Sequence, residues 1–210
     1  MSRAPVDLIR RSDGALVEAT LIDGVQPEDL VFVERDSWGR VRAQIRGKLR
    51  AGSVPRAEWP QSLHWDWSRK AAELTLLEVT GFAILCDEDW QAIMLTKTAS
   101  YTARLSADKG KPLVYIDYIE TASWNWPLPA LGEGGRYKGV GLILIREAVK
   151  QSYREGFHGR VGLHALQQAE GLYKRCGMTP VAHDEKKQGL LYFEFSPAQA
   201  KKFMEEGGEQ

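Results

Sequence analysis

The feature that most constrains the fold is a strand–helix–strand run in the second half of the chain. Residues 113–119 form an almost continuous apolar run, which is typical of a buried strand. Residues 140–153 carry apolar side chains at helical spacing, and Gly156 follows as a natural C-terminal stop. Residues 160–164 indicate a second strand. Because strands joined by a helix pair in parallel with a right-handed crossover, this run predicts one parallel pair.

The remaining segments predict antiparallel neighbours for that pair. Residues 74–85 and 92–95 indicate two strands of a hairpin, and residues 190–195 indicate a late strand. Helices are expected at 167–176 and after the Ser196-Pro197 pair, with serine as N-cap. We therefore expect a mixed α/β (α+β) fold, with a mostly antiparallel sheet flanked by helices and one parallel strand–helix–strand unit.

The first 60 residues differ from the rest of the chain, because they carry many charges and two turn signals. This difference predicts an N-terminal extension. A short strand is indicated at 16–22, between two Asp-Gly turn signals. Residues 27–50 fit a charged, surface-lying helix that begins with proline and acidic residues. Pro55 to Pro60 is interpreted as a joint. The chain is thus divided into an extension at 1–60 and a main domain at 61–210.

The composition argues against several partners and locations. The 28 basic and 28 acidic residues cancel, so no global field steers the chain toward nucleic acid or an anionic membrane. No segment approaches the ~20 apolar residues that span a bilayer, and the N-terminus lacks the apolar run of a signal peptide. Cys86 and Cys176 lie far apart without metal-ligand spacing. We expect a cytoplasmic protein with free thiols and no metal, and the zero net charge argues against a nucleic acid partner without excluding one.

The segment Arg136-Tyr137-Lys138-Gly139-Val140-Gly141 predicts an anion site where the 140–153 helix begins. The first helical turn leaves backbone N–H groups unpaired, and the helix dipole adds partial positive charge there. Glycines let an anion approach the backbone closely, while Arg136 and Lys138 add full charges. The P-loop pattern is absent, and the dinucleotide pattern G-x-G-x-x-G fails at its sixth position.

A second segment makes the motif specific. After the following strand, the chain reads A-x-x-x-Y-x-x-x-G-M from Ala169 through Tyr173 to Gly177-Met178. A strand, then R-x-x-G-x-G opening a helix, then this segment resembles the GCN5-related N-acetyltransferase (GNAT) family over roughly residues 74–195. The stretch 124–141 resembles a bacterial subgroup of that family.

The resemblance implies an enzyme, an N-acetyltransferase that binds acetyl-CoA and transfers acetyl directly to a small-molecule or protein amine. It also implies the residues that hold the cofactor. The sequence departs from the family pattern at Leu166, which occupies a position where the family often has asparagine. His164, two residues earlier, is a candidate to replace the cofactor contact of that asparagine. The cofactor-binding residues implied are Ile119, Thr121, Arg136, Tyr137, Lys138, Gly139, Val140, Gly141, Leu166, Ala169 and Tyr173.

The resemblance also implies catalytic roles. Tyr173 matches the tyrosine that gives a proton to the departing thiolate, and a backbone N–H near Ile119 to Thr121 would polarise the carbonyl. Three residues are candidates for the base. Glu120 closes the first strand, Asp117 lies inside its apolar run, and His164 has a suitable intrinsic pKa.

The long loop after the first strand carries Trp124, Asn125 and Trp126, which either line the acceptor pocket or pin the loop to the sheet. Two other functions stay open. One is toxin-like acetylation of aminoacyl-tRNA, for which the basic cluster at residues 40–56 would serve. The other is a non-catalytic module that binds CoA to regulate a partner. No motif specifies a homodimer, although family members often form one.

Overall fold

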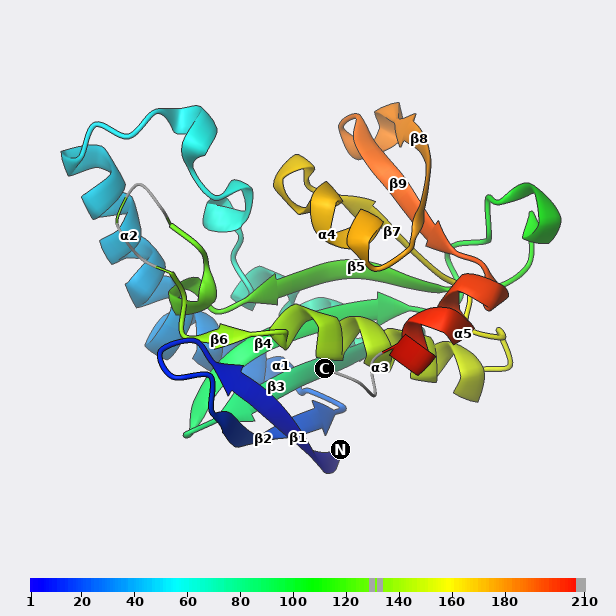
Figure 1. The fold of residues 1–210 in the computed structure, drawn as a ribbon, viewed down its shortest axis with the longest axis horizontal. Coiled ribbons are helices and arrows are strands. Elements are labelled where there is room, and N and C mark those ends of the chain that lie inside the picture. The colour runs from blue at the N-terminus through cyan, green and yellow to red at the C-terminus, as the bar shows by residue number, and fades with distance from the viewer. Residues whose placement is uncertain (129–130, 132–133, 207–210) are drawn as a thin grey trace. The chain divides into compact units, whose positions relative to one another are not determined.

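The computed structural model describes residues 1–128, 131 and 134–206 (Figure 1). Its strands follow the hydrogen-bonded order β6-β1-β2-β3-β4-β5-β7-β9-β8. The strands are β1 (Ser2–Arg10), β2 (Leu16–Asp23), β3 (Val79–Cys86), β4 (Asp89–Lys97), β5 (Val114–Thr121), β6 (Tyr137–Lys138), β7 (Val161–Ala165), β8 (Thr179–Asp184) and β9 (Leu190–Phe195). The α-helices are α1 (Pro27–Phe32), α2 (Gly39–Ala51), α3 (Val140–Arg154), α4 (Glu170–Arg175) and α5 (Pro197–Glu205).

The predicted strand–helix–strand unit is confirmed. β5 and β7 pair in parallel, with Val114 opposite Val161 and Ile116 opposite Leu163. The pairing ends there, although β5 continues to Thr121. The other recorded strand pairs, such as β1 with β2 and β7 with β9, are antiparallel, so the mixed, mostly antiparallel sheet is also confirmed.

Contacts divide the chain into two compact units. The first contains Met1–Met94 and Ile119–Leu144, and the second contains Leu95–Tyr118 and Ile145–Gln210. The predicted boundary at residue 60 stays an interpretation of the sequence.

In the first unit, β1 and β2 form a long hairpin, and β2 also pairs with β3. β1 was not predicted, because only Leu8 of its residues is buried and no clear alternation results. The prediction of a strand from residue 74 is wrong at its start, since β3 begins at Val79. Residues Ser68–Thr75 form a 3₁₀ helix instead, and the apolar Leu76 and Leu77 that prolonged the pattern are exposed.

The predicted charged helix is present as an unbroken helical run from Pro27 to Ala51, with a π-helical turn at Val33–Trp38 between α1 and α2. It is not only a surface helix, because its inner face buries Trp38, Ile45 and Leu49. Gly39 is required by the π turn. A Cβ there would lie 2.2 Å from the carbonyl oxygen of Glu34.

In the second unit, β7, β9 and β8 pair in sequence, and Ser196 caps α5 with a reciprocal capping box. Gly162 on β7 lies beneath the ring of Tyr192 on β9, which is fully buried. A Cβ at Gly162 would stand 2.1 Å from the Tyr192 hydroxyl oxygen. Only glycine therefore lets this ring lie against the strand.

A Gly162→Ala variant is expected to lose about 1–3 kcal/mol of unfolding free energy, because a rigid buried ring must move. Urea denaturation measures this loss. Gly47→Ala in α2 is the matched control, since its Cβ meets nothing within 4 Å, and helix propensity predicts a gain of up to ~1 kcal/mol. Equal stability of the two variants would contradict the close-packing argument.

Among the described residues, none of the helices has the length and apolar character needed to cross a bilayer. The same residues contain no group of three or more His, Cys, Asp or Glu side chains placed to hold a metal ion.

Candidate functional site

The predicted anion segment forms a turn between β6 and α3 in the first unit. Gly139 has a φ of +75°, a conformation that favours glycine, and its carbonyl accepts the N–H groups of Leu142 and Ile143. α3 begins at the next residue, Val140. Apart from chain neighbours and the backbone of α3 itself, no atom of the described residues lies within 4 Å of the place that a Cβ of Gly139 or Gly141 would occupy. The start of α3 is therefore open to an approaching anion.

Asn125 fixes the position of this turn. Its side-chain oxygen accepts the Tyr137 N–H at 3.1 Å, and its amide donates to Gln91 Oε1 at 3.0 Å. Trp124 Nε1 also donates to Gln91 Oε1, at 2.9 Å. Gln91 is buried on β4 and was missed by sequence reasoning, although a polar residue inside an apolar strand was the available signal. Trp124 and Asn125 thus pin the loop, while their contact with an acceptor stays a prediction.

Two further residues of the long loop region are tied together. Trp126 is buried, and its Nε1 donates to the Thr121 carbonyl at 3.0 Å. Ile119, two residues before Thr121 on β5, is half-buried. The backbone of Ile119 to Thr121 stays a predicted cofactor contact.

The charges of the turn are exposed. Arg136 lies 3.5 Å from Asp89 in an exposed pair, and its guanidinium lies 5.2 Å from the Trp124 ring centroid. Lys138 is exposed too. Tyr137 points inward, where its hydroxyl donates to Asp87 at 3.2 Å, and burial raises the pKa of that phenol. The turn therefore presents two cations and keeps its aromatic side chain inside.

Glu120 lies in a buried charge cluster of the first unit. Its Oε2 accepts Trp67 Nε1 at 2.6 Å and an Arg42 nitrogen at 3.3 Å. Another Arg42 nitrogen contacts the Glu34 carboxylate at 3.0 Å. Oε1 of Glu120 has no hydrogen-bond partner among the described residues. Burial raises the pKa of Glu120, and the Arg42 charge and the Trp67 hydrogen bond oppose that rise.

The other two base candidates lie in the second unit, and both are bonded. Asp117 pairs with Lys97 at 2.6 Å. His164 Nδ1 lies 2.7 Å from the Tyr115 hydroxyl, and Nε2 lies 3.2 Å from Asp184. Since an ionised carboxylate only accepts, Nε2–H donates to Asp184 and Nδ1 accepts from Tyr115. Burial lowers the pKa of His164. The neutral ring therefore has no nitrogen left for a direct contact.

Tyr173 lies on α4 of the second unit, where its ring packs 5.8 Å from that of Phe193. Burial raises its pKa, so the phenol keeps its proton. The preceding 3₁₀ turn begins after Leu166, whose carbonyl accepts the Ala169 N–H at 2.8 Å. Burial also raises the pKa of Cys176 to about 11, which keeps it a thiol. These residues form the predicted helix, and their cofactor contacts stay predictions.

Comparisons with known proteins identify the fold. No protein-family model matches the chain, and no curated protein matches its sequence. A GNAT-family acetyltransferase from Listeria monocytogenes matches with a TM-score of 0.53 at 14% identity, over 90% of this chain and 99% of its own. An uncharacterised protein from Bacillus halodurans matches with a TM-score of 0.55 at 12% identity, over 95% and 94%. The chain therefore has the fold of the GNAT acetyltransferases.

Proposed function

From the fold that this chain shares with GNAT acetyltransferases, we propose that it transfers acetyl from acetyl-CoA directly to an amine. The observation that carries the proposal is the open glycine turn at the start of α3. The diphosphate of CoA matches that turn in charge, since the turn offers backbone N–H groups, the helix dipole and the side chains of Arg136 and Lys138.

The acetyl thioester of the bound cofactor supplies an activated acyl group. The amine attacks the carbonyl carbon, the C–S bond breaks, and the amine nitrogen loses a proton. Tyr173, whose phenol burial keeps protonated, is proposed to give its proton to the departing thiolate. No covalent enzyme intermediate is needed, and Cys176, as a protonated thiol, is not a nucleophile.

Glu120 is the base candidate that the contacts favour. A base needs an unshared lone pair, and both ring nitrogens of His164 are occupied. The Asp117 carboxylate is held by Lys97 at 2.6 Å. Oε1 of Glu120 is buried and has no partner among the described residues, so it is proposed to accept the proton of the amine through water.

Purified protein mixed with acetyl-CoA and a panel of amines tests the function through release of free thiol. The panel contains small polyamines, lysine peptides and aminoacyl-tRNA, so the same assay separates acceptor classes. Release above the amine-free rate supports the enzyme. Calorimetric binding of CoA without release on any acceptor would instead favour a non-catalytic binding module, and absence of binding would overturn the proposal altogether.

A Gly141→Ala variant separates binding from folding. Its Cβ meets nothing within 4 Å and alanine is the better helix former, so thermal stability should not fall. Because the added methyl group stands where the diphosphate approaches the backbone, CoA affinity should fall on the order of tenfold by calorimetry. Unchanged affinity would place the anion elsewhere, and Gly47→Ala is the control for a glycine far from the turn in sequence.

A further inference from the structure

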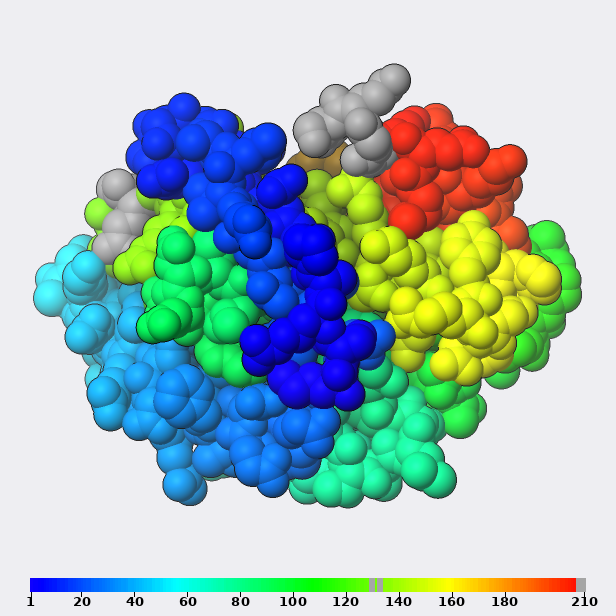
Figure 2. Space-filling model, turned by 90° about the horizontal axis from the view of Figure 1, so that it is seen from below, coloured from blue at the N-terminus to red at the C-terminus, as the bar shows by residue number. Residues whose placement is uncertain are grey.

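The end of β1 lies beside the glycine turn, because it pairs with β6, the short strand that precedes the turn. β1 pairs with β6 so that Ile9 lies opposite Lys138 and Arg10 opposite Tyr137. The ladder extends one residue further, because the Arg11 N–H donates to the Arg136 carbonyl at 2.8 Å. Figure 2 shows the hairpin, coloured blue, on the surface of the molecule.

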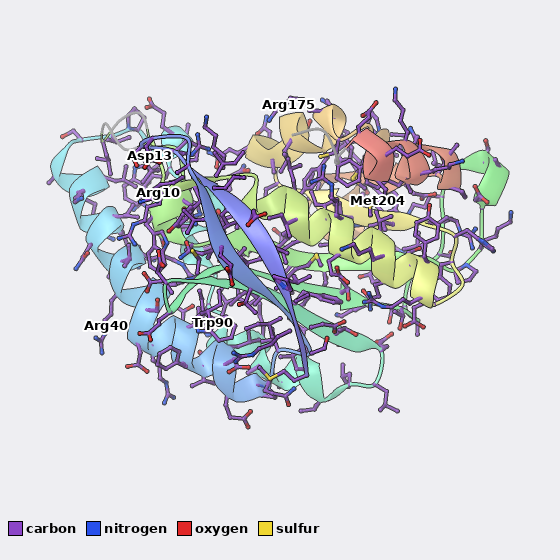
Figure 3. All side chains as sticks on the ribbon, turned by 60° about the horizontal axis from the view of Figure 1, so that its bottom comes forward. Arg10, Asp13, Arg40, Trp90, Arg175 and Met204 are labelled. Atoms are coloured by element: carbon purple, nitrogen blue, oxygen red, sulfur yellow. The ribbon has the colours of Figure 1, made fainter. Side chains whose placement is uncertain are left out.

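This register places three cations on one face. Residues opposite each other in an antiparallel pair share a face, and alternate residues of one strand do so too. Arg11, Arg136 and Lys138 therefore lie together, while Arg10 belongs to the other face. Figure 3 labels Arg10 at the turn end of the hairpin beside Asp13, and the two pair at 3.5 Å.

Arg11 is oriented but not neutralised. Its Nε donates to the Tyr137 carbonyl at 3.1 Å, which fixes the direction of the guanidinium. The side chain is exposed, and among the described residues no carboxylate forms an ion pair with it. An arginine fixed through Nε keeps two terminal nitrogens for a bidentate contact with a phosphate.

We propose that Arg11 binds the 3′-phosphate of CoA, an inference that rests on the proposed function. The diphosphate is matched by the backbone of the turn, which leaves the phosphomonoester on the ribose as the second anion of the ligand. A phosphomonoester carries about two negative charges near neutral pH and is the group that a free arginine fork recognises best. Arg11 would thus set the preference of the protein for CoA over 3′-dephospho-CoA.

Calorimetric titration of the full chain with CoA and with 3′-dephospho-CoA tests this role. Arg11→Gln should weaken CoA binding about tenfold and change 3′-dephospho-CoA binding less than twofold. The ratio of the two affinities comes from one protein preparation, so partial misfolding does not affect it. Arg3→Gln, at the other end of the same strand, is the control and should keep the wild-type ratio.

Two results would overturn the assignment. Equal weakening for both ligands would place Arg11 on the diphosphate, and wild-type affinity for both ligands would place it outside the site. Either result leaves the proposed function standing, provided that the wild-type protein binds CoA. Failure of the wild-type protein to bind either ligand is the separate result that overturns the proposed function.

Discussion

Replacing Arg42 with alanine is expected to lower the free energy of unfolding by about 3–5 kcal/mol, because the buried Glu120 and the half-buried Glu34 lose their shared cation. Arg42 is only 2% exposed, although α2 carries it in a strongly charged stretch. Its guanidinium contacts Glu34 at 3.0 Å, Glu120 at 3.3 Å and the carbonyl oxygen of Trp65.

The loss should grow as the pH rises. Burial raises the pKa of Glu120 in the folded protein above its unfolded value, so this group favours folding most below the unfolded pKa, near pH 4. That contribution is lost as the pH rises through the folded pKa. Since Arg42 opposes the rise, its removal raises the folded pKa of Glu120 further. The difference between wild type and Arg42→Ala should therefore be smaller at pH 4.5 than at pH 7.

Urea denaturation followed by tryptophan fluorescence measures this effect. All seven tryptophans belong to the first unit, Met1–Met94 and Ile119–Leu144, which also contains the Arg42 cluster, so the fluorescence reports the unfolding of that unit. Arg40→Ala is the matched control. It removes the same side chain two residues earlier on α2, where Figure 3 shows it on the outside of the helix. Its pair with Asp36 is exposed and should contribute less than ~1 kcal/mol. Equal losses would show that Arg42 does not hold the cluster together.

The Arg42 cluster shows which part of the fold the sequence could predict. The strand–helix–strand run and the helix from Pro27 were readable because periodicity and caps are local signals. The local pattern also placed Arg42 among solvated arginines of a basic helix. Its burial follows from contacts with Glu34 and Glu120, which no periodicity in one segment encodes. The basic surface weighed for aminoacyl-tRNA therefore loses one of its cations.

The candidate site likewise has residues that local sequence signals predicted and residues that they did not. Gly139 and Gly141 were predicted to open a helix to an anion, and the φ of Gly139 and the free space at both glycines agree with that local argument. Gln91 and Arg11 were missed, because each meets the turn through a distant segment. The hydrogen bond between Arg11 and Tyr137 joins residues 126 positions apart. Strand register sets such contacts, and a short edge strand such as β6 has no sequence signature.

A Tyr173→Phe variant is expected to lose on the order of 10²- to 10³-fold in kcat with acetyl-CoA and the best acceptor, because the departing thiolate loses its proton donor. This expectation rests on the proposed function. The change keeps the ring, so the packing against Phe193 at 5.8 Å is retained. No hydrogen bond to the hydroxyl is found within the described part of the chain, so folding should not suffer.

Three measurements on that variant separate an acid from a packing residue. Thiol release gives kcat, calorimetry gives the dissociation constant of CoA, and thermal melting gives stability. An acid predicts loss in kcat alone, because its interaction strengthens only as charge develops on sulfur. Tyr153→Phe, which removes a hydroxyl from an exposed tyrosine of α3, should leave all three unchanged. If Tyr173→Phe turned over at the wild-type rate, the proton would have to come from another group or from water.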